Sequence, residues 1–339
     1  MLARVAARLD RAAFSPTSLP DDLITAIALA PTVIAGLFIF KLRALEMLVI
    51  ALAIGIGALI VARWLWRASV PRPQASPLLA AVVGVALLGP GTVADAAPII
   101  ASVTISVVAV GLELLRARYV PVVRAQSGLL AYAAFVLIAK SAATAFVNPV
   151  SGRPMEDPVG IWYNLVGPAA PPIQIYNPIT LYMGNVSGPV FATSLLAVAV
   201  GVAWLAYARR LSFAVATGFL MGAIIPISAF HWDMLFQLDS GPTWFAAALL
   251  LSDRRLLPNS MAIRPVLGFG AGLLAIGLRT RGLGIEGAFL TVAGVQAVMA
   301  VIVATLWSIS SATESWERAR RLRKREAQLR VVEGIPKAS

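Results

Sequence analysis

The sequence predicts an all-α polytopic membrane protein, with about ten transmembrane helices in two inverted five-helix repeats. Apolar residues make up 59% of the 339 residues and charged residues only 13%, whereas a soluble domain of this length carries far more charge. Two apolar segments, near residues 77–89 and 243–251, are shorter than the roughly 20 residues that a helix needs to cross a bilayer. Each begins with a proline after a small residue, which is a good helix start. Their matching places, third and eighth among the segments, predict the repeat.

The chain divides into five expected regions. Residues 1–22 form an amphipathic segment on the cytoplasmic surface of the membrane, and residues 310–339 form a basic cytoplasmic tail. Between them lie the first membrane repeat (23–147), an external loop rich in proline and aromatic residues (148–187), and the second membrane repeat (188–309). The ten apolar segments lie near residues 23–40, 44–66, 77–89, 93–115, 128–147, 188–208, 211–230, 243–251, 262–278 and 287–309.

Lysine and arginine positions orient the chain. With the N-terminus inside, basic residues gather in the inner loops, while the external loop at 148–187 carries only Arg153. This positive-inside pattern predicts a bacterial inner-membrane protein with both termini in the cytoplasm. The inner-loop residues are Arg67, Arg72, Arg116, Arg118, Arg124, Arg209, Arg210, Arg254 and Arg255, and the exceptions are Lys41, Arg43, Arg279 and Arg281.

The composition excludes several kinds of site. The chain has no cysteine, so it holds no iron–sulfur cluster, disulfide or thiol nucleophile of its own. His231 is the single histidine, so this chain alone builds no metal or haem site from paired histidines. The net charge is +12, and the basic residues that cause it lie between the apolar blocks and at the two ends of the chain. This distribution is typical of contact with a lipid bilayer, so nucleic acid is not expected as a partner. A redox role therefore needs an organic cofactor or a metal held by a partner subunit.

Asp253 and the pair of Arg279 and Glu286 are candidate site residues next to the apolar segments. Asp253 follows segment 243–251. It is either a helix end among lipid head groups or a carboxylate that faces a polar cavity and holds a cation or a cofactor amide. Arg279 and Glu286 are close enough in sequence to pair across a turn. That pair is either a structural clamp or a contact to a flavin, a proton route or a sodium route.

Lys140 lies within the fifth apolar segment. Unless it lies near a helix end, where a lysine can reach the interface, it needs a carboxylate partner. Glu113 and Asp95, in or near the fourth segment, are the expected candidates.

The stretch from Ser240 to Phe289 carries a resemblance to a known family. Its motifs, in order and spacing, resemble the membrane subunit that Rnf electron-transport complexes (as Rnf-D) share with the sodium-pumping NADH:quinone oxidoreductase (as Nqr-B). The resemblance covers roughly residues 185–305, and this chain has Ser252-Asp253-Arg254 where the family has a Thr-Asp-Pro-like motif. The motifs are Ser240-Gly241, the run Trp244–Leu251, Ser252-Asp253, the glycines Gly268, Gly270 and Gly272, and Arg279…Gly282…Glu286-Gly287-Ala288-Phe289.

The resemblance implies ten helices in two inverted repeats, and it implies flavins. Family members carry an FMN attached through its phosphate to a threonine at the external side, and they can bind riboflavin. Here the corresponding place is 184–190, where Val190 stands at the acceptor position. Valine has no hydroxyl, so we expect no covalent FMN, while a non-covalent flavin (FMN or riboflavin) or a quinone stays open as a cofactor. The cofactor-binding residues that the resemblance implies are Ser187, Gly188, Thr193, Ser252, Asp253, Arg279 and Glu286.

Three functions remain open from the sequence. The leading one is an integral membrane subunit of a multi-subunit redox complex, with other membrane subunits as partners and with ion translocation as an open question. The alternative is a structural or assembly subunit of a larger respiratory or photosynthetic complex in which the redox chemistry has been lost. A small-solute transporter is the third, because inverted repeats with short central helices also build transporters.

Overall fold

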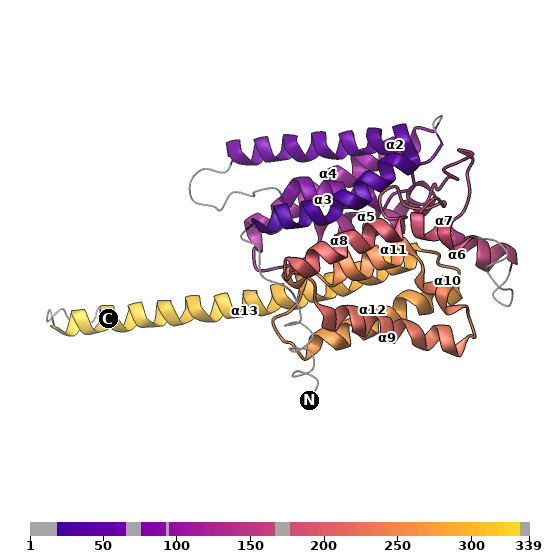
Figure 1. The fold of residues 1–339 in the computed structure, drawn as a ribbon. Coiled ribbons are helices and arrows are strands. Elements are labelled where there is room, and N and C mark those ends of the chain that lie inside the picture. Colours follow the sequence, from indigo (N-terminus) through magenta and orange to yellow (C-terminus); the bar gives the residue numbers. More distant parts are fainter. Residues whose placement is uncertain (1–18, 66–75, 93–94, 167–176, 333–339) are drawn as a thin grey trace.

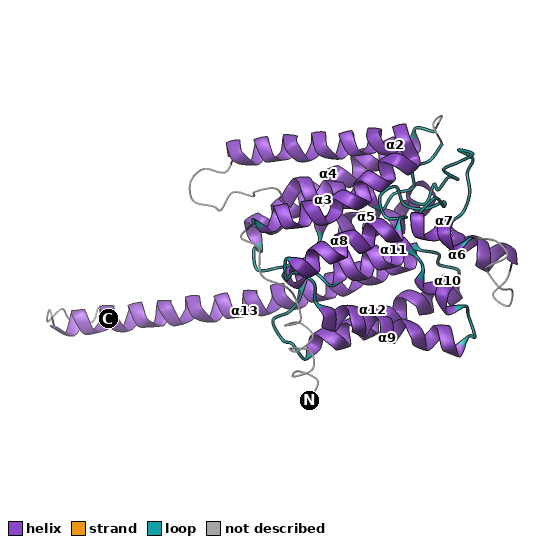
Figure 2. Cartoon of the chain, in the orientation of Figure 1, coloured by secondary structure: helices purple, strands orange, loops and turns teal. Residues whose placement is uncertain are grey.

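The computed structural model shows a nearly all-helical protein (Figure 1). Figure 2 shows helices joined by loops, and the described residues hold two isolated β-bridges, Val147–Pro154 and Leu211–Asp253, but no strand. Most of the predicted surface segment 1–22 lies outside the described part of the chain. The predicted inner-loop residues Arg67 and Arg72 also lie outside it. The described residues are 19–65, 76–92, 95–166 and 177–332.

The first half of the chain contains helices α2 to α5. The two first predicted segments form one helix, α2 (Asp21–Leu65), which is broken at Lys41, where φ is 50° and ψ is −120°. The break falls between segments 23–40 and 44–66, and Figure 1 shows the two parts of α2 as separate rods. The other helices of this half are α3 (Ser76–Ala86), α4 (Ala97–Tyr119) and α5 (Ser127–Ala143).

Short elements follow between the two halves. They are α6 (Pro158–Ile161), the π-helix η1 (Trp162–Val166) and α7 (Pro178–Met183). Trp162 is 1% exposed and packs edge-on against Trp232, with ring centroids 5.3 Å apart. This contact fixes the predicted external loop onto the second half of the chain.

The second half of the chain contains the remaining helices. The predicted segment 188–208 is helical only from Leu195, because residues 188–194 form a non-helical, buried segment that enters the core. The last helix continues beyond the predicted end at residue 309, to Val332. The helices are α8 (Leu195–Tyr207), α9 (Phe213–Ala229), α10 (Met234–Leu238), α11 (Gly241–Trp244) continued by the π-helix η3 (Phe245–Leu251), the 3-10 helix η4 (Arg254–Leu256), α12 (Ile263–Gly277), the 3-10 helix η5 (Leu278–Arg281) and α13 (Glu286–Val332).

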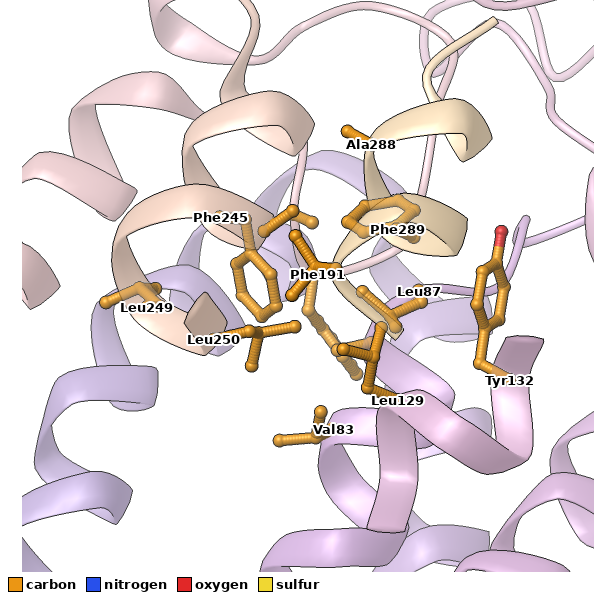
Figure 3. Close-up of a cluster of buried hydrophobic side chains, with 14 of the residues drawn as sticks. Val83, Leu87, Leu129, Tyr132, Phe191, Phe245, Leu249, Leu250, Ala288 and Phe289 are labelled. Carbon is orange, nitrogen blue, oxygen red and sulfur yellow. The ribbon is translucent and has the colours of Figure 1, made fainter. Parts of the chain in front are cut away.

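The two short apolar helices that the sequence predicts lie in the centre of the molecule. All seven residues of η3 are buried, as are nine of the eleven residues of α3. A helix that is apolar all round is a buried helix. Figure 3 shows side chains of α3, α5, η3 and α13 meeting around Phe191, which comes from the non-helical segment. The core therefore lies where the two halves of the chain meet.

Helices α9 and α12 pack through glycines. A Cβ atom on Gly222 would lie 2.0 Å from the carbonyl oxygen of Phe269, and one on Gly272 would lie 2.0 Å from that of Phe219. Backbones this close admit only glycine, as in small-residue helix contacts within membranes. Gly270, by contrast, faces open space.

Four of the described helices are long and apolar enough to cross a membrane. They are Asp21–Trp64, Ala97–Tyr119, Ile263–Arg281 and Glu286–Ser310. Shorter apolar helices complete the bundle, among them α3 and the Gly241–Leu251 helix. Many large apolar side chains on the outer faces are exposed, for example Phe38, Ile138 and Val301. Such faces suit lipid as their surroundings, so the chain is a multi-pass membrane protein.

Candidate functional site

The predicted site residues fall into two groups at opposite ends of the core. The first group lies beside the segment that joins the two halves, at an end of the core that we call the Glu286 end. It consists of Ser187, Gly188, Thr193, Arg279 and Glu286. Ser252 and Asp253 follow η3 at the other end, the Asp253 end. The seven residues therefore do not form one site.

Ser187 and Thr193 line a small cavity at the Glu286 end. The cavity holds about 20 Å³ and is also lined by Ser240 and Gly241 of the α11 start and by Ile285. The Ser187 hydroxyl donates to the carbonyl oxygen of Glu156. A space of this size holds one or two water molecules and is far smaller than a flavin.

Val190, which the resemblance places at the position of flavin attachment, is completely buried in the structure. The Val190 N–H donates to the carbonyl oxygen of Leu88 at 2.8 Å, and the Phe191 N–H donates to that of Ala86 at 3.2 Å. The Val190 carbonyl oxygen lies 2.2 Å from the place where a Cβ on Gly36 would stand. The position thus lacks a hydroxyl and is closed off by its own backbone neighbours, so its residues do not fit a phosphate-linked flavin.

Arg279 is buried in a network of neutral groups. Its Nη1 donates to the backbone and side-chain oxygens of Gln237, and its Nη2 donates to the Thr243 hydroxyl at 2.9 Å, which in turn donates to Ser240. The predicted pair of Arg279 with Glu286 is therefore wrong. Among the described residues no carboxylate makes an ion pair with Arg279. Its Nε and the Nε2 of Gln237 are buried without a hydrogen-bond partner.

Glu286 pairs instead with Lys140, whose Nζ lies 2.8 Å from the carboxylate. Glu113 and Asp95, the partners expected for Lys140, are engaged elsewhere, so that prediction is also wrong. Glu113 accepts from Arg116 and Ser127, and Asp95 accepts from the N–H of Ala97. The reason is topological: α13 begins beside the end of α5, so Lys140 meets a carboxylate from the far half of the chain.

Asp253 is also buried, and its carboxylate forms an ion pair with an arginine. Arg210 reaches both Asp253 oxygens, at 2.9 and 2.5 Å, and it also donates to the Asp21 carbonyl at 3.0 Å. The Arg255 N–H donates to Asp253 as well. Asp253 is thus neither a solvated helix end nor an open ligand. It ties η4 to the start of α2 and to the link between α8 and α9. Ser252 is buried, and its hydroxyl donates to the Ala247 carbonyl.

Two adjoining cavities of different character lie at the Asp253 end. The first, of about 230 Å³, is lined mainly by polar and charged side chains. The second, of about 520 Å³, is an open groove lined mainly by apolar residues, which include Met299 and Val303 on α13. Arg124 and Leu256 line both, so the cavities adjoin at these two residues. The polar and charged residues of the first are Asp21, Asp22, Ser76, Glu113, Arg116, Arg124, Gln126 and Arg255.

Several of these residues were not among the predicted site residues. In the sequence argument, the arginines at this end appear only as inner-loop charges. They are Arg116, Arg124, Arg210 and Arg255.

Asp157, at the Glu286 end, is a further residue that sequence reasoning missed. It directly precedes Pro158, and an aspartate just before a proline is typical of a helix N-cap. In the structure its carboxylate accepts from the N–H groups of Val159 and Gly160 at 3.0 and 3.1 Å. Within the described ranges, no group of three acidic, histidine or cysteine side chains could hold a metal ion.

The apolar helices, the buried ion pairs at both ends and the lipid-suited outer faces define a polytopic helical membrane protein. The sequence matches the model of the NQR2, RnfD, RnfE family over residues 22–306, and the chain belongs to this family. It is therefore a membrane subunit of the Rnf or Nqr type, as the motif order from Ser240 to Phe289 predicted. No curated protein matches the sequence.

Proposed function

We propose that this chain is an integral membrane subunit of a multi-subunit electron-transport complex and that the two adjoining cavities at the Asp253 end take a lipid-soluble quinone. The single observation that carries the proposal is that a polar cavity adjoins a groove lined mainly by apolar residues, with Arg124 and Leu256 lining both. A quinone has a polar ring and an apolar tail. The 230 Å³ cavity suits the ring, and the 520 Å³ groove along Met299 and Val303 suits the tail.

Arg124 is the residue that would hold the ring. It is exposed, and no hydrogen bond or ion pair with another described residue engages it. Arg116 and Arg255, in contrast, are bound to Glu113 and Asp22. A guanidinium beside a quinone carbonyl donates a charge-assisted hydrogen bond. When bound, the quinone supplies two-electron, two-proton redox chemistry, for which partner subunits provide the electrons.

A binding experiment tests this proposal. The purified chain is titrated with a short-chain quinone in detergent, in the wild type and in the Arg124→Gln and Arg118→Gln variants. Arg118, on α4, lines neither cavity. A hydrogen bond to a charged group contributes about 1.5–3 kcal/mol, so Arg124→Gln should weaken binding about tenfold or more. Arg118→Gln should leave it unchanged.

Two other outcomes of the same preparation are informative. Flavin absorbance and in-gel fluorescence that disappear on denaturation would indicate a non-covalent flavin in this cavity. Co-purified phospholipid that Arg124→Gln removes would indicate a lipid site. Either result, or equal quinone binding by all three proteins, contradicts the quinone assignment.

A second candidate function is a structural subunit that keeps the fold without redox chemistry. Buried Val190 and the 20 Å³ cavity beside Ser187 favour it, because neither accommodates the flavin of the family. Deleting the chain would then lower the amount of assembled complex, while the surviving complexes transfer electrons at the wild-type rate. A loss of rate in assembled complexes argues for the first function.

We also propose that the two halves are inverted five-helix repeats, with the predicted cytoplasmic side at the Asp253 end. Two observations support this layout. Each half has an eleven-residue apolar helix that starts with a proline at its second position, Ser76–Ala86 and Gly241–Leu251. The charged residues Arg116, Arg124 and Arg255 lie together at the Asp253 end, away from the long loop.

A further inference from the structure

Two buried carboxyl groups lie close together at the Glu286 end, and among the described residues only one of them has an ion-pair partner. Asp157 is 5% exposed and Glu286 is 3% exposed. A Cβ on Gly284 would lie 2.3 Å from an Asp157 oxygen and 3.0 Å from a Glu286 oxygen, so both carboxylates face the same point. Lys140 neutralises Glu286 at 2.8 Å. Among the described residues no basic side chain makes an ion pair with Asp157.

The groups around Asp157 decide which form of its carboxyl is stable. Glu286 of α13 opposes its ionisation, while Arg279 of η5 and the two N–H groups of α6 favour it. The hydroxyl of Tyr132, from α5, is fully buried without a hydrogen-bond partner and interacts electrostatically with both carboxylates. In Figure 3 this hydroxyl points toward the end of the molecule where α13 begins. Burial and Glu286 prevail and raise the pKa of Asp157 to about 6.

We propose that the buried pair of Asp157 and Glu286 forms a proton-binding site, in which the carboxyl of Asp157 holds the proton near the Glu286 carboxylate. With that proton in place Asp157 is neutral and Glu286 keeps its ion pair with Lys140, so neither carboxyl is a buried charge without an ion-pair partner. A proton also needs no cavity, which suits this close-packed position. Lys140 is half-exposed and links the site to the outside. Protonation of Asp157 removes its repulsion from Glu286, so the joining segment can pack closely against the first turn of α13.

The pH dependence follows from the raised pKa. A carboxyl whose pKa is higher in the folded protein than its ordinary 3.8 binds its proton more tightly when folded. Its stabilising effect is complete at low pH and is lost as the pH rises through about 6. The wild-type protein should therefore lose thermal stability as the pH is raised from about 5 to about 7. Infrared spectra should show a protonated-carboxyl band that titrates away over the same range.

Three variants of the full chain, in detergent or nanodiscs, test the site. Asp157→Asn should abolish both the pH dependence and the titrating band. Glu286→Gln should shift the titration to lower pH, because the repelling charge is gone and Lys140 becomes free to pair with Asp157. Glu46→Gln is the control: its carboxylate pairs with Arg43 on α2 and is not among the groups that act on Asp157, so its loss should leave the titration in place.

Other results overturn the proposal. One is a wild-type stability that is constant over this pH range, and another is a titration that persists in Asp157→Asn. Should that variant fail to fold, the wild-type band and its shift in Glu286→Gln still decide. Restoration of stability by sodium at a fixed alkaline pH would assign the pair to a metal cation instead of a proton.

Discussion

At the scale of single residues, a buried charge with one ion-pair partner depends on that partner. Glu286 is the clearest case, because its carboxylate is 4% exposed and its ion pair is with Lys140. Lys140→Met would keep the apolar stem of the side chain and remove the charge. We expect a loss of about 1–3 kcal/mol in the free energy of unfolding, the cost of leaving a buried charged group without its partner. Reversible unfolding in detergent micelles measures it.

The double variant Lys140→Met with Glu286→Gln is the control for this prediction. It removes both charges and so should recover much of the lost stability, because replacing both partners of a buried pair is far less costly than removing one. If the single and double variants are equally unstable, the lysine acts through packing alone and the ion pair contributes little.

At the scale of elements, the contact between α9 and α12 tests whether glycine spacing sets helix approach. Gly272→Ala would place a methyl group 2.0 Å from the Phe219 carbonyl oxygen, and the helices would have to separate. We expect a loss of about 1–3 kcal/mol, typical of overpacking. Gly270→Ala, two residues away on the same helix, meets nothing within 4 Å. It should be neutral or stabilising by up to about 1 kcal/mol through its higher helix propensity. Equal thermal midpoints for the two variants would contradict this account.

Elements were more predictable than their contacts. The short helices followed from interrupted apolar runs that Pro77 and Pro242 begin, and hydropathy located most of the long helices. The non-helical segment 188–194 was missed although Gly188-Pro189 and the N-cap residue Ser194 are signals against a helix before Leu195. Its backbone is nevertheless satisfied by carbonyls of the α3 end, and irregular backbone at such depth is tolerated only when protein buries it.

At the scale of the whole molecule, the sequence could not show which charges meet. Arg279 and Glu286 are seven positions apart, yet each takes its partner from another element, since tertiary packing and not sequence distance selects the pair. The same holds for Asp253 with Arg210. Family membership identifies the class of protein, whereas the site depends on which side chains the fold brings together.

Gln296 of α13 joins the two halves of the molecule, and its loss should weaken their contact. Its Oε1 accepts from the Gln126 N–H at 2.8 Å, at the start of α5, and its Nε2 donates to the Leu250 carbonyl of η3 at 3.0 Å. Gln296→Leu keeps the volume but leaves a buried donor and a buried acceptor unpaired, each of which costs about 1–3 kcal/mol. Val298→Leu, on the exposed side of α13, should change stability by no more than about 0.5 kcal/mol. Proteolysis of the folded protein should also become faster in Gln296→Leu alone, because opening between the halves exposes their linking segments. A Gln296→Leu protein with wild-type unfolding and proteolysis would mean that apolar packing around Phe191, and not this polar bridge, holds the halves in register.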